Sequence, residues 1–226
     1  MNLIYTGKTK DVYENQDGTY TLKLKDSATG KDGKFDPGEN AVGLEIEGLG
    51  RESLRMSKYF FEKLTYAGIP HHYITSDIAA ATMTVKPAKA FGNGIEFICR
   101  RKADGSFIRR YGAYITHGTD LDNFVEVTIK DDARNDPPIT KDALLTLSIM
   151  TQDQYEACKS LTKNITQLVA GILAQNDLEL YDIKYEFGIS EGEVILIDEF
   201  SAGVMRVYKN GNPVPPMELA RLILED

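Results

Sequence analysis

The segment that most constrains the fold reads Asp182-Ile183-Lys184-Tyr185-Glu186-Phe187-Gly188-Ile189 and continues through Ser190-Glu191-Gly192 to Asp198. Apolar residues at 183, 185, 187 and 189 alternate with Asp182, Lys184, Glu186 and Gly188, which is typical of a β-strand with two different faces. We predict a hairpin with strands over 180–189 and 193–199, joined by a three-residue loop, Ser190-Glu191-Gly192. In that register Lys184 lies opposite Asp198. The charged face of the hairpin then contains Asp182, Lys184, Glu186 and Asp198.

That charged face has two interpretations. Two carboxylates at the spacing of Glu186 and Asp198 can hold Mg²⁺ together with phosphate oxygens, and Lys184 beside them can offset charge that develops during phosphoryl transfer. The same pattern is typical of a solvent-facing sheet surface with cross-strand ion pairs, and the alternation alone favours this second interpretation. A shift of one residue in the pairing would also send Asp198 to the other face.

Composition excludes several classes of protein. The chain has 226 residues, with 42% hydrophobic and 27% charged, which is ordinary for a soluble globular protein. It contains neither an apolar run of about 18 residues nor a signal-peptide pattern, so we expect no membrane association. A net charge of −8 argues against a nucleic-acid partner. Two cysteines that form no motif, Cys99 and Cys158, are consistent with a reducing cytoplasm, which is the predicted location.

The predicted elements give an α+β fold. Strands are expected within 3–25 and over 70–76, 81–86, 94–101 and 124–130, and helices over 51–67 and 151–176, with a short helix opening at Pro215-Pro216. The glycine-rich residues 26–50 are predicted to be a long loop. Strands dominate the first 90 residues, so we predict a β-rich lobe over 1–90 and a mixed lobe over 91–226.

Two basic motifs are candidate anion sites. Lys8 and Lys10 are two apart on a presumed strand that follows Gly7, and two ammonium groups there can clamp phosphates; a solvated strand face is the alternative. The run Arg100–Ser106 is predicted to be a strand that ends in a glycine turn, in which Arg100 and Ser106 can hold one phosphate. A solubilising run of charges is the alternative. The three histidines lack the partners of a zinc site.

The order of these motifs along residues 5–206 resembles the SAICAR synthetase family. The resemblance is carried by Tyr5–Tyr13, Ala67–His72, Arg100–Ser106, Lys130–Asp132 with Asp136-Pro137, Asp182–Gly188 and Asp198–Ser201. It implies an α+β fold whose N-terminal lobe resembles a kinase small lobe, with ATP in the cleft, and it implies an enzyme that is often a homodimer. It also implies an ATP-dependent ligase of purine biosynthesis. In that reaction ATP phosphorylates the carboxylate of 5-amino-1-(5-phosphoribosyl)imidazole-4-carboxylate (CAIR), and L-aspartate displaces phosphate to give SAICAR.

The resemblance also implies a role for individual residues. The nucleotide would be contacted by Lys8, Lys10, Val12 and Lys130, with the connector 86–95 taking the adenine. Magnesium would be bound by Glu186 and Asp198. The ribotide phosphate would be held by Arg100, Ser106 and Arg206, and Asp182 and Lys184 would be the catalytic residues near the reacting carboxylate.

The chain departs from the family's pattern after Asp198-Glu199-Phe200-Ser201. The family continues with Pro-Asp, whereas this chain has Ala202-Gly203 and so lacks one acidic group beside the substrate site. A diverged ligase that activates another small carboxylate is therefore one alternative to the leading hypothesis. A small-molecule kinase with the same ATP cleft and a nucleotide-binding protein without catalysis are two others. The presence of Lys10, Glu186 and Asp198 together argues against the last.

Overall fold

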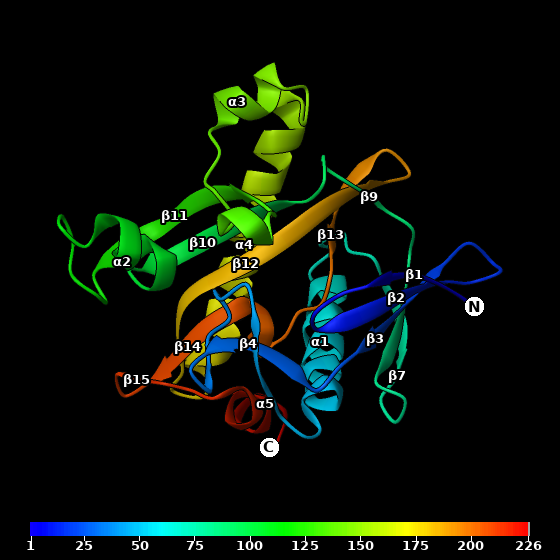
Figure 1. Cartoon of the computed structure of the whole chain (residues 1–226), viewed down its shortest axis with the longest axis horizontal. Coiled ribbons are helices and arrows are strands. Elements are labelled where there is room, and N and C mark those ends of the chain that lie inside the picture. Colours follow the sequence, from blue (N-terminus) through cyan, green and yellow to red (C-terminus); the bar gives the residue numbers. More distant parts are fainter. Residues whose placement is uncertain (226) are drawn as a thin grey trace. The chain divides into compact units, whose positions relative to one another are not determined.

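A computed structural model describes residues 1–225 and divides the chain into two compact units. The first unit comprises residues 1–89, 197–204 and 215–225, and the second comprises 90–196 and 205–214. The predicted lobes, 1–90 and 91–226, follow the chain in order, whereas in the structure two late segments belong to the first unit. Figure 1 shows the course of the chain from the N-terminus to the C-terminus. No helix among the described residues is long and apolar enough to cross a membrane.

The first unit contains a five-stranded antiparallel sheet in the order β1-β2-β3-β8-β7. Its strands are β1 (Asn2–Thr6), β2 (Lys10–Glu14), β3 (Tyr20–Leu24), β8 (Thr82–Val85) and β7 (Tyr73–Asp77). The predicted helix over 51–67 is confirmed as α1 (Leu49–Tyr66), which packs against β3, β7 and α5 (Pro216–Leu224). Fully buried apolar side chains such as Leu54, Phe60 and Phe61 fix the face of α1 that points inward.

Residues 26–50 do not form the predicted long loop. They build a three-stranded sheet in the order β5-β4-β6, with β4 (Ser27–Lys31), β5 (Lys34–Phe35) and β6 (Val42–Glu45). A Cβ atom at Gly43 would lie 2.4 Å from the carbonyl oxygen of Gly30. Two of the glycines that suggested a loop therefore allow close approach of two backbones.

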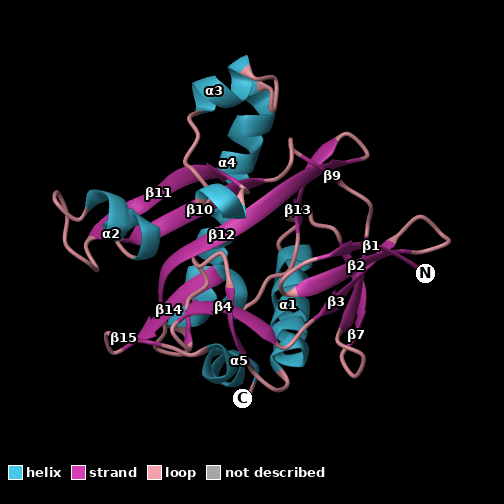
Figure 2. Ribbon diagram, viewed as in Figure 1, coloured by secondary structure: helices cyan, strands magenta, loops and turns pink. Residues whose placement is uncertain are grey.

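The second unit contains an antiparallel sheet in the order β11-β10-β12-β14-β15, and β9 and β13 pair with β12 off this path. Its strands are β9 (Lys89–Ala90), β10 (Ile95–Lys102), β11 (Asp120–Ile129), β12 (Glu179–Ser190), β13 (Glu193–Ile197), β14 (Met205–Lys209) and β15 (Asn212–Pro213). The predicted helix over 151–176 is confirmed as α4 (Gln152–Ala174), which contacts β10, β11 and β12. Figure 2 shows the strands and helices that make up this α+β fold.

One face of this second sheet is apolar and packs on α4. Phe97 on β10 meets Phe187 on β12 edge to face at 5.6 Å between ring centroids, and it also meets Tyr155 of α4 at 5.7 Å. Tyr185 of β12 shares a hydrogen bond of 3.0 Å with Thr166 of α4. Because side chains alternate along a strand, Glu96 and Arg100 of β10 point away from α4, as do Asp182, Lys184 and Glu186 of β12.

The predicted hairpin over 180–189 and 193–199 is confirmed, because β13 pairs with β12, but its turn and its end differ from the prediction. β12 runs through Ser190, so only Glu191 and Gly192 form the turn, and both have left-handed φ values of 52° and 87°. Such a pair makes a two-residue hairpin turn, not the predicted three-residue loop. β13 ends at Ile197, and Asp198 follows it with a left-handed φ of 74°. Strand alternation therefore does not determine where the side chain of Asp198 points.

Several short elements were not expected. α2 (Gly105–Tyr111) replaces the predicted glycine turn after Lys102, and α3 (Lys141–Thr146) and two 3₁₀ turns, η1 (Asp132–Arg134) and η2 (Ala202–Val204), complete the chain. α2 begins where the Asp104 carboxylate accepts a hydrogen bond of 2.7 Å from the Gly105 N–H. Ser106 thus lies in the first turn of a helix.

Candidate active site

The polar face of the second sheet brings charged side chains from four strands together. The registers pair Arg100 with Asp182 and Asp182 with Arg206, and they pair Glu96 with both Glu186 and Thr128. Directly opposed residues project to the same side of a sheet. One surface therefore carries Glu96, Arg100, Glu126, Thr128, Asp182, Lys184, Glu186 and Arg206.

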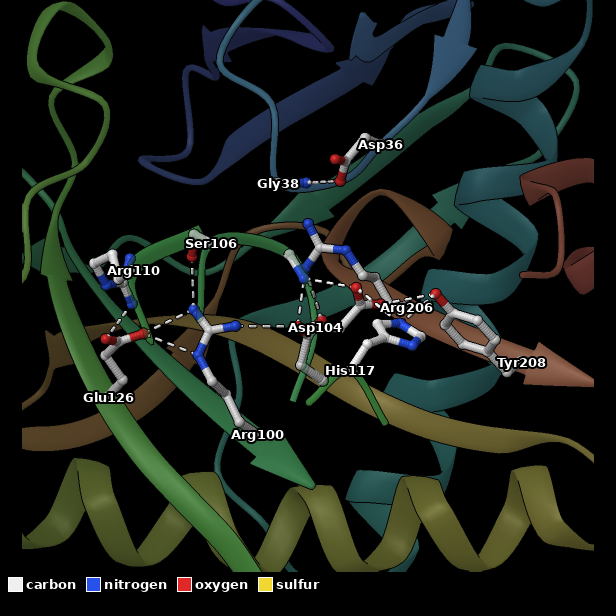
Figure 3. A network of polar contacts seen from close by, with 12 residues as sticks. Asp36, Gly38, Arg100, Asp104, Ser106, Arg110, His117, Glu126, Arg206 and Tyr208 are labelled. Carbon is white, nitrogen blue, oxygen red and sulfur yellow. Dashed lines mark hydrogen bonds and ion pairs between the residues drawn. The ribbon is translucent and has the colours of Figure 1, made fainter. Parts of the chain in front are cut away.

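Arg100 is the centre of one network on this surface, shown in Figure 3. It is 1% exposed. Its Nε and Nη2 donate to Glu126 at 2.9 and 2.7 Å, its Nη1 donates to Asp182 at 3.1 Å, and its Nη2 also donates to Ser106 at 2.8 Å. A buried guanidinium needs such partners, because an unpaired charge inside a protein is strongly destabilising. The side chain is thus locked in one orientation.

Arg206 is held on the other side of Asp182. Its Nη1 donates to the two carboxylate oxygens of Asp182 at 2.9 and 3.1 Å. Gly105, which has a left-handed φ of 52°, lies against the guanidinium group, and a Cβ atom there would be 2.5 Å from the Cζ atom of Arg206. Arg110 pairs with Glu126 as well. Arg100, Arg110 and Arg206 therefore gather around the carboxylates of Glu126 and Asp182.

A second cluster supports the start of α2. The Tyr208 hydroxyl donates to Asp104 at 2.9 Å, and His117 Nε2 lies 3.3 Å from the same carboxylate (Figure 3). The Tyr208 ring stacks on Tyr181 at 3.8 Å. Burial, together with the hydrogen bond to Asp104, raises the pKa of Tyr208 well above its ordinary value, so the phenol remains a donor. Asp104 is thereby fixed while it caps the helix that carries Ser106.

The other end of the polar face holds two lysine–carboxylate pairs. Lys184 Nζ donates to Glu96 at 2.7 Å, and the second oxygen of Glu96 accepts from Thr128 at 2.8 Å. Burial acts to lower the pKa of Lys184, but Glu96 and Glu186 raise it more, so the amine stays protonated. Lys130 Nζ lies 2.5 Å from Glu186. Each lysine therefore has a carboxylate partner on the same face.

A further charged cluster lies within the first unit. Lys10 Nζ is 2.5 Å from Asp198 and 2.7 Å from Glu199. Burial acts to lower the pKa of Lys10, but the two carboxylates together raise it above its ordinary value. One ammonium group thus faces two carboxylates, and the cluster carries one net negative charge.

Lys8 and Lys10 do not act as the predicted pair on one strand face. β2 begins at Lys10, so Lys8 lies in the preceding bend, where its Nζ donates to the Asn40 carbonyl at 2.9 Å. Strand alternation therefore does not place the side chains of Lys8 and Lys10 on the same face. Val12, two residues further along β2, is partly buried and pairs with Leu22 of β3.

Comparison with known proteins shows the family to which this chain belongs. The model of the SAICAR synthetase family matches residues 3–216. The chain belongs to the SAICAR synthetase family. It is 55% identical over its whole length, and over the whole relative, to the phosphoribosylaminoimidazole-succinocarboxamide synthase of Clostridium tetani.

Solved structures of SAICAR synthetases share the fold. One with 35% identity superposes with a TM-score of 0.80 and covers 92% of this chain and 86% of its own. A second, a SAICAR synthetase in complex with ADP, is 22% identical and has a TM-score of 0.85, with 98% and 97% of the two chains covered. At that identity the second likeness shows the fold alone.

The structure groups the residues that the family resemblance implicated into separate clusters. Arg100, Ser106, Asp182 and Arg206 form one network, whereas Lys184 pairs with Glu96. Glu186 and Asp198 belong to different units, and each is paired with a lysine. Their convergence on one metal ion stays a prediction, as do the roles of the individual residues.

Sequence reasoning missed the carboxylates that hold the basic residues: Glu96, Glu126, Glu199 and Asp104. Two of them left a signal in the sequence. Glu96 and Glu126 each interrupt an otherwise apolar strand, in Ile95-Glu96-Phe97 and Val125-Glu126-Val127. A charged residue inside a buried strand needs a partner, so each predicts an ion pair, although neither identifies the partner.

The donor set fits magnesium in type. Mg²⁺ commonly takes one or two protein carboxylates and completes its octahedron with phosphate oxygens and water. Glu186 and Asp198 supply that number of carboxylates. Residues 1–225 contain no group of three or more His, Cys, Asp or Glu side chains placed to hold a metal on their own.

Burial raises the pKa of Cys99, and it raises that of Cys158 to about 12, so both thiols are protonated at neutral pH.

The departure from the family pattern lies in η2. The Gly203 N–H donates to the buried Ser201 hydroxyl at 3.1 Å, and Ala202 is buried. The turn is thus held by its own backbone and by Ser201, and residues 202 and 203 offer no carboxylate.

Proposed function

We propose that this chain is an ATP-dependent ligase that joins L-aspartate to CAIR and releases SAICAR, ADP and phosphate. The observation that carries the proposal is the network of Arg100, Ser106 and Arg206 around Asp182, in a chain of the SAICAR synthetase family. A phosphorylated ribotide needs such a set of fixed cations and a hydroxyl donor.

The reaction requires two transfers. A carboxylate oxygen of CAIR attacks the γ-phosphorus of ATP, and the bond from that phosphorus to the oxygen of ADP breaks, which gives an acyl phosphate. The aspartate nitrogen then attacks the acyl carbon, phosphate leaves with the bonding electrons, and the nitrogen loses a proton. Lys184, protonated beside Glu96, would offset negative charge on the reacting carboxylate. Asp182 orients Arg206, which would hold the ribotide phosphate.

Glu186 and Asp198 are the residues that would hold Mg²⁺, which supplies charge neutralisation on the phosphates. Both carboxylates are already ion-paired, with Lys130 and with Lys10. Nucleotide binding would exchange partners, because each lysine can turn to a phosphate oxygen as its carboxylate turns to the metal.

The remaining nucleotide contacts are assigned to Lys8 and Val12, with the adenine in the connector 86–95. We also propose a homodimer in the cytoplasm. Sedimentation of the purified chain tests the homodimer, and cell fractionation tests the cytoplasmic location.

Purified protein with ATP, Mg²⁺, CAIR and L-aspartate is expected to release ADP and to form the succinocarboxamide product. Omission of either CAIR or aspartate should abolish product formation, and mass spectrometry of the mixture identifies the product. ADP release without that product would overturn the proposed function.

A second candidate is a ligase that activates another small carboxylate, which is favoured by Ala202-Gly203 in place of the family's Pro-Asp. A panel of carboxylic acids and amines in an ADP-release assay separates the two functions. Faster turnover with another acid than with CAIR would support the second candidate.

A further inference from the structure

Asp198 has a left-handed backbone conformation directly after strand β13. Its φ of 74° lies in the left-handed region, which is uncommon for a residue with a side chain and persists where the surroundings hold it. The segment just after β13 presents Asp198 and Glu199 to Lys10, and the Asp198 carboxylate also accepts from the Glu199 N–H at 2.8 Å. The direction of both carboxylates therefore depends on what fixes this stretch of backbone.

His72 holds the first residue of the stretch. Its Nε2 lies 2.9 Å from the Asp198 carbonyl oxygen. A carbonyl can only accept, so Nε2 carries the proton and donates. The ring is 4% exposed and lies 5.6 Å from that of Phe61 on α1, between ring centroids. The buried His72 ring thus donates its Nε2–H to the backbone carbonyl of Asp198.

Ser57 of α1 holds the third residue. The Phe200 N–H donates to Ser57 Oγ at 3.0 Å, and this hydroxyl donates in turn to the Ser53 carbonyl at 2.8 Å. The Phe200 ring stacks on Phe60 at 4.7 Å. Ser57 is fully buried among apolar neighbours on α1, where an alanine would fit the helix at least as well. The Ser57 hydroxyl accepts from the Phe200 N–H and so holds the end of the segment 198–200 in place.

We propose that His72 and Ser57 are positioning residues that fix the backbone of Asp198–Phe200 and thereby aim the Asp198 carboxylate at Lys10 and at the magnesium ion of the nucleotide. The inference rests on the proposed function only in assuming that the chain binds a magnesium nucleotide. Groups that orient a metal ligand through a hydrogen bond typically change metal affinity about 10- to 100-fold when they are removed.

The test compares ADP binding with and without Mg²⁺ by calorimetry. His72→Leu removes the donor, and His72→Gln replaces it with an amide N–H. His71→Leu is the matched control, because His71 is adjacent, and its Nε2 contacts Thr65 rather than Asp198. Ser57→Ala removes the second anchor and serves as an independent variant if His72→Leu does not fold.

We expect His72→Leu and Ser57→Ala each to weaken Mg–ADP binding about tenfold and to raise the half-saturating Mg²⁺ concentration for turnover similarly. Their affinity for ADP without metal should change less than about twofold. His72→Gln should recover most of the Mg–ADP affinity, and His71→Leu should match the unsubstituted chain.

Equal losses of affinity with and without Mg²⁺ would overturn the inference, as would equal behaviour of His72→Leu and His71→Leu. An unsubstituted chain that binds Mg–ADP but forms no SAICAR would overturn the proposed function alone. In that case the calorimetric comparison still decides the role of His72 and Ser57.

Discussion

Asp182 and Asp198 are carboxylates from the same predicted hairpin, yet their surroundings differ. Asp182 is buried between two arginines, Arg100 and Arg206, and so acts as a fixed anchor for both. Asp198 is partly exposed, and it shares its cationic partner Lys10 with Glu199. A carboxylate whose partner can turn to another anion is available to a metal ion. The two aspartates should therefore respond differently to substitution.

Asp198→Asn is expected to lower turnover by at least about 10²-fold, because removal of a group that stabilises transition-state charge commonly has an effect of this size. Steady-state kinetics with saturating Mg–ATP measure it. The control is Glu62→Gln, which removes an exposed carboxylate from α1. Near-normal turnover of Asp198→Asn would show that this residue is not a metal ligand.

Gly105→Ala should raise the KM for CAIR about tenfold with a smaller effect on the KM for ATP. The added Cβ would collide with the guanidinium group of Arg206, and the left-handed φ at this position also disfavours alanine. The matched control is Gly171→Ala on the exposed side of α4, where a Cβ meets no neighbour and alanine favours the helix. A similar change of KM in both variants would contradict the assigned role of Gly105.

At the scale of elements, α4 and β12 show how local signals and packing cooperate. The buried face of α4 includes Ile165, Val169 and Leu173 and also Thr162 and Thr166, whose hydroxyls donate to backbone carbonyls four residues earlier. Burial of a threonine is tolerated because its donor is satisfied within the helix. The helix covers the apolar face of the sheet and leaves the other face to the charged residues.

Thr151→Ala should lower the free energy of unfolding by about 1 kcal/mol. Thr151 and Gln154 form a reciprocal capping box, in which each side chain accepts from the other residue's backbone N–H, at 3.2 and 2.8 Å. Urea denaturation followed by circular dichroism measures the change. Thr151→Ser keeps the hydroxyl and is expected to retain most of the stability; an equal loss in both variants would exclude the cap as the cause.

At the scale of the whole molecule, the balance of buried charge makes stability depend on pH. Burial lowers the pKa of both His71 and His72 to about 4, below the ordinary value of 6.5. Between these values the unfolded chain binds more protons than the folded chain. The stabilisation is therefore complete above about pH 6.5 and is lost as the pH falls through about 4.

The unfolding free energy of the ligand-free protein should thus fall between pH 6.5 and 4, with a contribution from His72 of up to about 3 kcal/mol. Thermal or urea unfolding at a series of pH values measures the slope. His72→Gln removes one titrating group and should flatten the slope. A variant with an unchanged pH dependence would show that His72 is not buried in its neutral form.

Much of the fold was accessible from the sequence, because the strong signals were local. Alternation in β12 and helical periodicity in α4 identified those elements, and the family motifs named the candidate site residues. The three-stranded sheet within 26–50 was missed because the sequence alone does not distinguish a glycine that lets two strands approach closely from a glycine in a loop. α2 was missed because a charged stretch after β10 contains a glycine that starts a helix rather than a turn.

The sequence by itself determined which side chains of β12 share a face, since the two-residue period of a strand is a property of the local backbone. Only the tertiary structure decided their partners. Arg100 finds Glu126 and Asp182 across 26 and 82 residues of chain, and Lys10 finds Glu199 across 189. The arginine pairs depend on the order of the strands in the sheet, and the Lys10 pair depends on the left-handed backbone at Asp198. The local sequence pattern specifies neither the strand order nor this backbone conformation.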